Sequence, residues 1–188
     1  MKKTRCSWVN LKNELYVSYH DEEWGVPVFD DTKLFEFLVL EGAQAGLSWE
    51  TILKRREGYR KAFANWNIHT IAQFDEEKIQ ELLTNPEIIR NKLKVRSAVK
   101  NAQACIKIQK EFGNFSKYIW RFVSNKQVTN QQNGIEQLPV LTKISQEIST
   151  DLRKRGFSFV GPTIIYAFMQ AVGMINDHTI DCFRYNEV

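Results

Sequence analysis

Apolar residues recur at helical spacing through most of this chain, and short polar breaks separate the apolar segments. The acidic residues around Asp30 can cap a helix over 32–44, and Ser48 can cap the helix that follows. Asp75 can open a further helix, because the two glutamates after it are favourable at the positive end of a helix. Alternation typical of a strand never extends beyond a few residues, so the pattern predicts an all-α protein.

The second half of the chain follows the same pattern except in one stretch. Apolar positions over 93–112 form one stripe of a long amphipathic helix, and a final pair of helices is predicted over 142–155 and 162–173. The exception is 124–140, which is rich in Asn and Gln. We expect this stretch to be a mobile surface loop.

The turn between the last two predicted helices has the features of a helix-hairpin-helix. The first helix ends near Gly156, and Pro162 fits the first turn of the second because the missing N–H of proline costs nothing there. A tight turn at Gly161 would point backbone N–H groups at an anion, and DNA phosphate is the obvious candidate. The basic residues Arg153 and Arg155 add positive charge. A plain helical hairpin is the alternative.

One carboxylate interrupts the apolar stripe of the helix predicted over 32–44. Leu34, Phe37 and Leu38 lie on that stripe, and Glu41 follows where another apolar residue is expected. A buried glutamate is costly unless it is paired or used. It is therefore either a structural carboxylate bonded to backbone or arginine, or an acceptor on the floor of a ligand pocket.

Aromatic residues are concentrated at the start of the chain. They are Trp8, Tyr16, Tyr19, Trp24 and Trp49. Clustered aromatics more often fill a core than line a binding surface, but rings beside a buried carboxylate suit a flat, positively charged ligand. The rings would stack on such a ligand and add cation–π attraction, and the carboxylate would pair with its charge or accept from its N–H groups.

Two cysteines and two histidines lie near the ends of the chain, Cys6 and His20 at the start and His178 and Cys182 at the finish. This is a common ligand set of a closed zinc site, which would tie the termini together and leave no open position for water. His178 and Cys182 would share a face of a helical turn, and Cys6 and His20 would come from loops or short turns. Four unrelated residues are the alternative, because no Cys-x-x-Cys is present.

Composition limits the remaining choices. The 188 residues, of which 43% are hydrophobic, suffice for one domain, and a net charge of +4 permits nucleic-acid binding without establishing it. Three cysteines make an odd count, which argues against a disulfide framework and for a reducing compartment. Because Met1–Trp8 is basic but followed by no apolar run, we expect no signal peptide and no membrane segment. The expected location is the cytoplasm, or the nucleus if the cell has one.

Together these segments resemble the 3-methyladenine DNA glycosylase I family of bacteria. The matching stretches, which span the chain, are Arg5–Trp8, Tyr19–Pro27, Leu40–Trp49, Arg155–Gly161 and Asn176–His178. The resemblance implies one all-α domain over 1–188 with the helix-hairpin-helix DNA glycosylase fold, in which two lobes surround a base pocket. It also implies one structural zinc ion per chain, joining the termini.

The resemblance further suggests roles for residues at the matching positions. Glu41 would read the flipped base, and the pocket aromatics would be Trp8, Tyr16, Tyr19 and Trp49. Leu47 would approach the gap left in the duplex, and the hairpin with Gly161, Arg153 and Arg155 would contact the DNA backbone. The zinc ligands would be Cys6, His20, His178 and Cys182.

The implied activity is hydrolytic removal of N3-methylated adenine from alkylated duplex DNA, which leaves an abasic site. Methylation at N3 makes the base cationic, so it leaves as a neutral molecule without a general acid. The enzyme would flip out the nucleotide, hold the base between aromatic faces and let water attack the sugar. Asp177 lies beside a zinc ligand, so we assign it no catalytic role. Free 3-methyladenine would be the product ligand, no membrane would be involved, and we expect a monomer.

Three other functions fit parts of the sequence. A non-catalytic module would recognise damaged DNA through the same pocket. A zinc hydrolase would need an open metal position, which a four-ligand site lacks. A helical small-molecule binder would show no salt-sensitive DNA binding, because phosphate contacts make affinity fall with salt.

Overall fold

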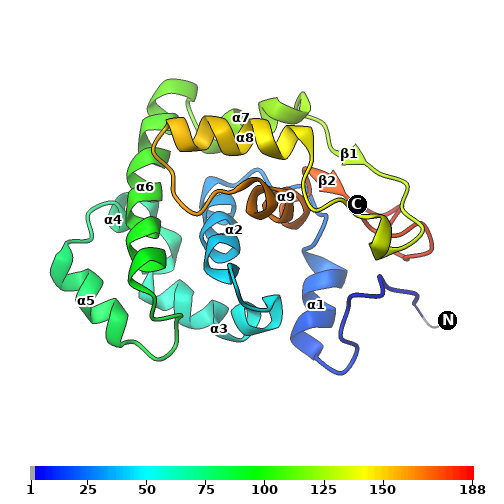
Figure 1. Cartoon of the computed structure of the whole chain (residues 1–188), viewed down its shortest axis with the longest axis horizontal. Coiled ribbons are helices and arrows are strands. Elements are labelled where there is room, and N and C mark those ends of the chain that lie inside the picture. The colour runs from blue at the N-terminus through cyan, green and yellow to red at the C-terminus, as the bar shows by residue number, and fades with distance from the viewer. Residues whose placement is uncertain (1–2) are drawn as a thin grey trace.

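The computed structural model describes residues 3–188 and is built mainly of helices (Figure 1). The α-helices are α1 (Glu14–Glu22), α2 (Asp31–Gln44), α3 (Trp49–Ala62), α4 (Ile68–Ile71), α5 (Glu76–Thr84), α6 (Lys92–Phe112), α7 (Phe115–Trp120), α8 (Lys143–Lys154) and α9 (Pro162–Ala171). Short 3₁₀ helices are η1 (Ala64–Trp66), η2 (Arg121–Val123) and η3 (Ile135–Gln137), and the strands are β1 (Val128–Thr129) and β2 (Ile175–Asn176). The predicted helical class is confirmed, apart from the two short strands.

The predicted helix starts are confirmed by their caps. The side chains of Asp30, Ser48 and Asp75 each accept a hydrogen bond from a backbone N–H in the first turn of α2, α3 and α5. Each cap satisfies a donor that the helix itself leaves without a partner. The Ser48 cap fixes the start of α3, where the short connection 45–48 from α2 ends.

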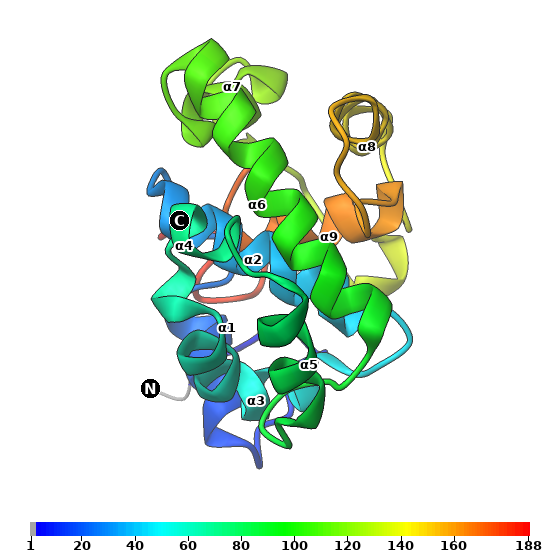
Figure 2. The same ribbon diagram turned by 90° about the vertical axis from the view of Figure 1, so that its left-hand side faces the viewer.

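Helix α2 is the centre of the molecule. It packs against α9, α3, α6 and α7, and Figure 2 shows α6 crossing in front of it. The sequence predicts that α2 buries one apolar stripe, and this is wrong because residues 34–43 are all buried. A helix surrounded by other helices buries every face. Glu41 is therefore enclosed within the fold.

The predicted hairpin is formed by α8 and α9, which pack against each other. Asn101 of α6 clamps its turn, because the Asn101 amide donates to Ser158 O at 3.0 Å and accepts from Ser158 N at 2.8 Å. Phe159 has a positive φ of 55° and lies directly against Gly42, where a Cβ would come within 3.2 Å of the Phe159 Cβ. The turn is thus seated on α2 beside Glu41.

The prediction of a mobile surface loop over 124–140 is wrong for its first half. Strand β1 pairs in parallel with β2, and Ile180 N donates to Gln132 O at 2.9 Å. The Gln127 amide donates to the backbone oxygens of Gly25 and Gly173. The polar residues of this stretch therefore serve as hydrogen-bonding groups to distant parts of the chain.

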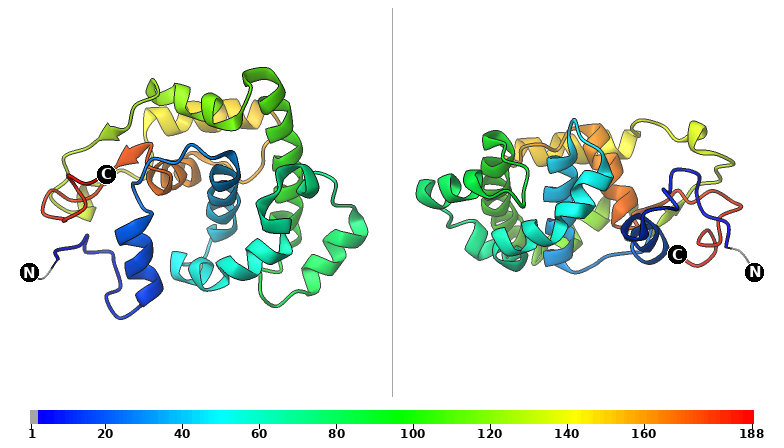
Figure 3. Two further views of the ribbon diagram at one scale, coloured as in Figure 1. Left: turned by 180° about the vertical axis from the view of Figure 1, so that it is seen from behind. Right: turned by 90° about the horizontal axis from the view of Figure 1, so that it is seen from below.

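The N-terminal segment from residue 3 onward and the C-terminus lie on the same side of the molecule, as Figures 1 and 3 show from opposite directions. His20 lies in the last turn of α1, so the expectation that it comes from a loop or short turn is wrong. The expectation of no signal peptide rests on the stretch Met1–Trp8. The first two residues of that stretch lie outside the described residues. Across residues 3–188 no helix combines the length and apolar character needed to cross a membrane.

Candidate base-binding pocket and metal-ligand cluster

A cavity of about 260 Å³ opens between α1, α2 and α9. Its walls are formed by Trp8, Tyr16, Tyr19, Trp24, Glu41, Gln44, Trp49, Leu138, Ala167 and Gln170. The four predicted pocket aromatics and Glu41 thus lie together, although they come from four segments of the chain. The cavity is mostly apolar with a few polar groups, which is typical of a site for a small planar ligand.

Glu41 is the carboxylate of this cavity, and it is 4% exposed. Among residues 3–188, no charged or hydrogen-bonding partner acts on it, and burial alone raises its pKa to about 8. A structural carboxylate would be paired, so this observation favours the interpretation of a ligand acceptor. An incoming cation would supply the missing partner and favour the ionised form.

The raised pKa of Glu41 predicts a dependence of stability on pH. In the unfolded chain Glu41 ionises near 4.5, whereas in the folded protein it keeps its proton to about 8. Its contribution to the free energy of unfolding is therefore present below pH 4.5 and is lost as the pH rises through 8. We expect Glu41→Gln to unfold at a higher temperature than the unmodified protein, by a margin that grows from pH 5 to pH 9 in calorimetric scans. An equal margin at every pH would contradict this.

The aromatic walls pack on one another as well as facing the cavity. The Trp8 ring lies edge-on to Tyr16 and Trp24, with ring centroids 5.5 and 4.9 Å apart, and Tyr19 lies 5.2 Å from Trp49. Burial, followed by the charge of Glu41, raises the pKa of Tyr19 well above its ordinary value. Mutual packing fixes the rings in place before any ligand arrives, and Tyr19 keeps its hydroxyl proton.

Several cavity residues were not predicted from the sequence. Trp24 belongs to the aromatic group noted above, but Gln44, Leu138, Ala167 and Gln170 had no such signal. Gln44 and Ala167 lie on α2 and α9, where their spacing alone does not distinguish cavity from core. Leu138 comes from the stretch expected to be a surface loop, so only the folded structure shows that it reaches the cavity.

Leu47 lies within the α2–α3 connection, and its side chain is 40% exposed. The connection is held from α6, because Lys94 Nζ donates to the backbone oxygens of Ala43 and Ala45 at 2.8 and 2.6 Å. Gly46 turns the chain with a φ of 78°, which favours glycine. An exposed apolar side chain is thus presented on a connection whose base is fixed.

The two predicted arginines of the hairpin have different surroundings. Arg153 is exposed, and its guanidinium lies 3.4 Å from the point where a Cβ on Gly161 would stand. Arg155 donates to both carboxylate oxygens of Glu111 and to Asp151. Arg153 is therefore open to an anion at the N-terminus of α9, whereas Arg155 is engaged within the protein.

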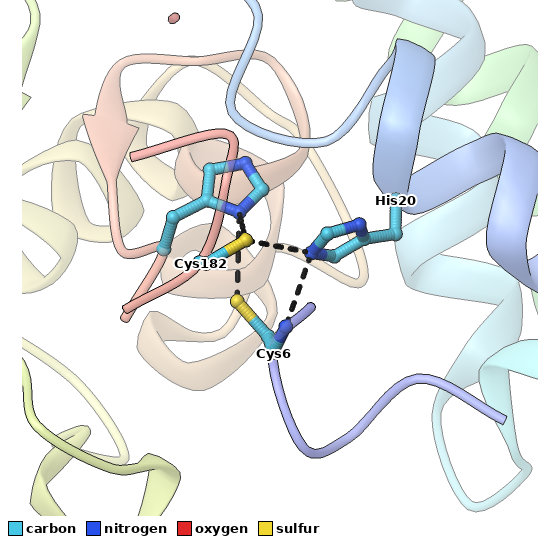
Figure 4. Close-up of side chains that lie close together, drawn as sticks. Cys6, His20 and Cys182 are labelled. Carbon is cyan, nitrogen blue, oxygen red and sulfur yellow. Dashed lines mark hydrogen bonds between the residues drawn. The ribbon is translucent and has the colours of Figure 1, made fainter. Parts of the chain in front are cut away.

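Cys6, His20, His178 and Cys182 come together at the joined termini, and all four are buried. Their candidate ligand atoms lie within 4.8 Å of one another. Figure 4 shows Cys6 on the N-terminal segment, His20 on α1 and Cys182 on the C-terminal segment pointing toward one another. His178 and Cys182 reach the cluster through a turn closed by Cys182 N and Thr179 O, and not through a helical turn. The donor set can hold a metal ion.

The outer nitrogen of each histidine in the cluster is also bonded. His20 Nδ1 lies 2.8 Å from Asp21 Oδ1, and His178 Nε2 lies 3.0 Å from Trp24 O. Such partners fix the ring so that the inner nitrogen faces the ligand position. Gly25 makes room for this, because a Cβ there would stand 3.0 Å from His178 Nε2. These contacts are those expected around histidines that ligate a metal.

Known proteins resemble this chain along nearly its whole length. The family model described as methyladenine glycosylase matches residues 8–185. The DNA-3-methyladenine glycosylase of Haemophilus influenzae is 45% identical over 179 residues, which cover 95% of this chain and 96% of the relative.

Solved structures share the fold as well. A crystal structure of 3-methyladenine DNA glycosylase I has a TM-score of 0.93 and 44% identity, covering 96% of this chain and 98% of the other. A variant of 3-methyladenine DNA glycosylase I in complex with 3-methyladenine has a TM-score of 0.92 and 35% identity, covering 95% of this chain and 96% of the other. The residues matched by the family model include every residue that lines the cavity and three of the four cluster residues, His20, His178 and Cys182.

Proposed function

This chain belongs to the methyladenine glycosylase family. On that basis we propose how its cavity binds and releases a base of damaged DNA. The protein is a DNA glycosylase that removes N3-methylated adenine from alkylated duplex DNA and leaves an abasic site for base excision repair. One observation carries the proposal: an aromatic cavity encloses a carboxylate that no group among residues 3–188 neutralises. A flat cationic base supplies both the stacking surface and the missing charge.

The chemistry required of the protein is limited by the substrate. The methylated base is cationic while it is attached to the sugar, and the bond between C1′ and N9 breaks with its electrons going to the base. The base leaves neutral, the oxygen of water bonds to C1′, and one proton is released. No residue must protonate the leaving group. The protein extrudes the nucleotide, orients it and stabilises the charged base.

Glu41 is the group that we propose to act on the base. Its carboxylate accepts a hydrogen bond from an N–H of the base and pairs with the positive charge. Because the cavity raises the pKa of Glu41 to about 8, a neutral adenine meets a carboxyl group that is mainly protonated at pH 7. Binding of the cation expels that proton, so the interaction favours the methylated base over the normal one.

The hairpin and the α2–α3 connection form the surface that we propose to face the duplex. The N-terminus of α9 at Gly161 and the exposed Arg153 would bind backbone phosphate. Leu47 would enter the space left by the flipped nucleotide. The seating of Phe159 on Gly42 links this surface to the helix that carries Glu41.

The two arginines offer a matched comparison. We expect Arg153→Gln to weaken duplex binding and to reduce the slope of log affinity against log salt by about 1, since one phosphate contact is lost. Arg155→Gln should leave that slope unchanged and lower the unfolding temperature, because its ion pairs with Glu111 and Asp151 are lost. Fluorescence titrations at several salt concentrations and a thermal melt measure both. A reduced salt slope in Arg155→Gln together with an unchanged slope in Arg153→Gln would contradict the proposed DNA-facing surface.

We further propose that the cluster at the termini holds one structural Zn²⁺ per chain. With Zn–S of about 2.3 Å and Zn–N of about 2.0–2.1 Å, the sulfur–nitrogen edge of a tetrahedron is about 3.6 Å. The cluster has three such pairs at 3.5 Å, namely Cys6–His178, Cys182–His20 and Cys182–His178. Four protein ligands leave no position for water, so the ion would join the termini without entering the reaction.

Counting abasic sites tests the proposed reaction against its alternatives. A duplex treated with a methylating agent is incubated with the protein, and strand breaks are measured before and after alkaline treatment. A monofunctional glycosylase produces breaks only after alkali, because the sugar stays in the strand. Salt-sensitive binding without abasic sites would instead identify a non-catalytic damage-recognition protein.

A further inference from the structure

The cavity has a polar group on α9 that the proposed mechanism does not use, the side-chain amide of Gln170. Gln170 Nε2 donates a hydrogen bond to Asp177 Oδ2 at 2.8 Å. Asp177 is 1% exposed and lies next to the cluster residue His178. The buried carboxylate of Asp177 is thus linked to the cavity wall by its hydrogen bond with the Gln170 amide.

Asp177 is surrounded by donors. Asn130 Nδ2 donates to Oδ1 at 2.7 Å, and Tyr166 OH donates to Oδ2 at 2.6 Å. A carboxylate offers only acceptors, so each neighbour must turn a donor toward it. The side-chain amide of Gln170 therefore cannot flip by 180°. Its nitrogen faces Asp177, and its oxygen points away from Asp177.

The oxygen end of Gln170 is open. Among residues 3–188, the buried side-chain nitrogens and oxygens without a partner are Trp49 Nε1, Trp66 Nε1 and Arg184 Nε. Gln170 Oε1 is not one of them and accepts no hydrogen bond from any of these residues, so it is in contact with solvent space. The space that Gln170 lines is the cavity. Its backbone is also fixed, because Gly25 N donates to Gln170 O at 3.0 Å.

We propose that Gln170 is a specificity-determining residue that accepts a hydrogen bond from the 6-amino group of the flipped base, with Asp177 as its positioning residue. This inference rests on the proposed function. The amino group of an N3-alkylated adenine carries two hydrogens, one for Glu41 and one for Gln170. Guanine carries an oxygen at that position, which would face two acceptors. A site built to accept from a donor rejects a base that lacks the donor.

Gln170→Met tests this, because it keeps the length of the side chain and removes the acceptor. Methylated duplex DNA that contains both 3-methyladenine and 3-methylguanine is the substrate, and both bases are quantified after release. We expect release of 3-methyladenine to fall about tenfold to hundredfold, as for loss of a hydrogen bond to a charged group, while 3-methylguanine release is unchanged or rises. Gln103→Met is the control, since Gln103 bonds Ala72 O away from the cavity.

A second measurement separates selectivity from packing. Tryptophan fluorescence reports binding of each free methylated base, because Trp8 and Trp49 line the cavity. We expect Gln170→Met to weaken only 3-methyladenine. An equal loss for both bases, or an unchanged ratio of release, would overturn the inference and leave Gln170 as a packing residue. If the unmodified protein releases neither base, the proposed function fails, and the binding ratio alone still decides the role of Gln170.

Discussion

Glu41→Gln is expected to lower the rate of 3-methyladenine release by about 10²–10³-fold, the usual cost of removing one group that stabilises developing or fixed charge in an enclosed site. The amide keeps the shape of the side chain but carries no charge to pair with the cationic base. Because an amide needs no proton to be neutral, the variant is also expected to be more stable than the unmodified protein at pH 8. Single-turnover release from methylated duplex DNA and a thermal melt at the same pH measure the two effects.

Glu36→Gln on the same helix is the matched control. Glu36 is also buried, but its carboxylate accepts from Arg56 at 2.6 Å and lies 3.1 Å from Lys33 Nζ. Its loss should lower stability and leave base release close to normal, since it does not line the cavity. Full activity of Glu41→Gln, or the same pattern of losses in both variants, would remove Glu41 from its proposed role.

Loss of the metal cluster is expected to have the largest effect on stability. We expect Cys182→Ser to abolish stoichiometric metal binding and to lower the unfolding temperature by roughly 10–20 °C, as follows from a loss of several kcal/mol in a chain of this length. The reason is that three segments, the N-terminal stretch, α1 and the C-terminal stretch, meet at this one cluster. Metal analysis and calorimetry measure the two quantities.

Cys105→Ala is the control for that experiment. Cys105 is fully buried in α6 but does not belong to the cluster. The variant should retain one metal ion per chain, and the effect on stability should be that of a small core change. Metal-free Cys182→Ser protein with an unchanged unfolding temperature would contradict a structural metal site.

Local signals in the sequence were sufficient for much of the fold. The capping residues Asp30, Ser48 and Asp75 begin helices as predicted, because a cap acts within one turn of its own position. Glu41 interrupts the apolar spacing of its helix, and the structure encloses it without a partner among residues 3–188. Signals of this kind need no knowledge of distant residues.

Features that depend on distant parts of the chain were not predictable in the same way. The pairing of β1 with β2 joins segments more than forty residues apart, and such short strands leave no alternation to detect. Leu138 reaches the cavity from the same polar stretch. The orientation of Gln170 depends on Asp177 and Asn130, which no local pattern links to it. The aromatic residues and the four cluster residues were ambiguous by spacing alone, and the family resemblance decided between their interpretations.

The most direct test of the central claim is the identity of the base that the protein releases. The folded, metal-replete protein is incubated with methylated duplex DNA, and the released bases are separated by chromatography. The cavity with Glu41 predicts release of 3-methyladenine with little 7-methylguanine. Binding of the duplex without release of any methylated base would contradict the account, and Glu41 would then need a different explanation.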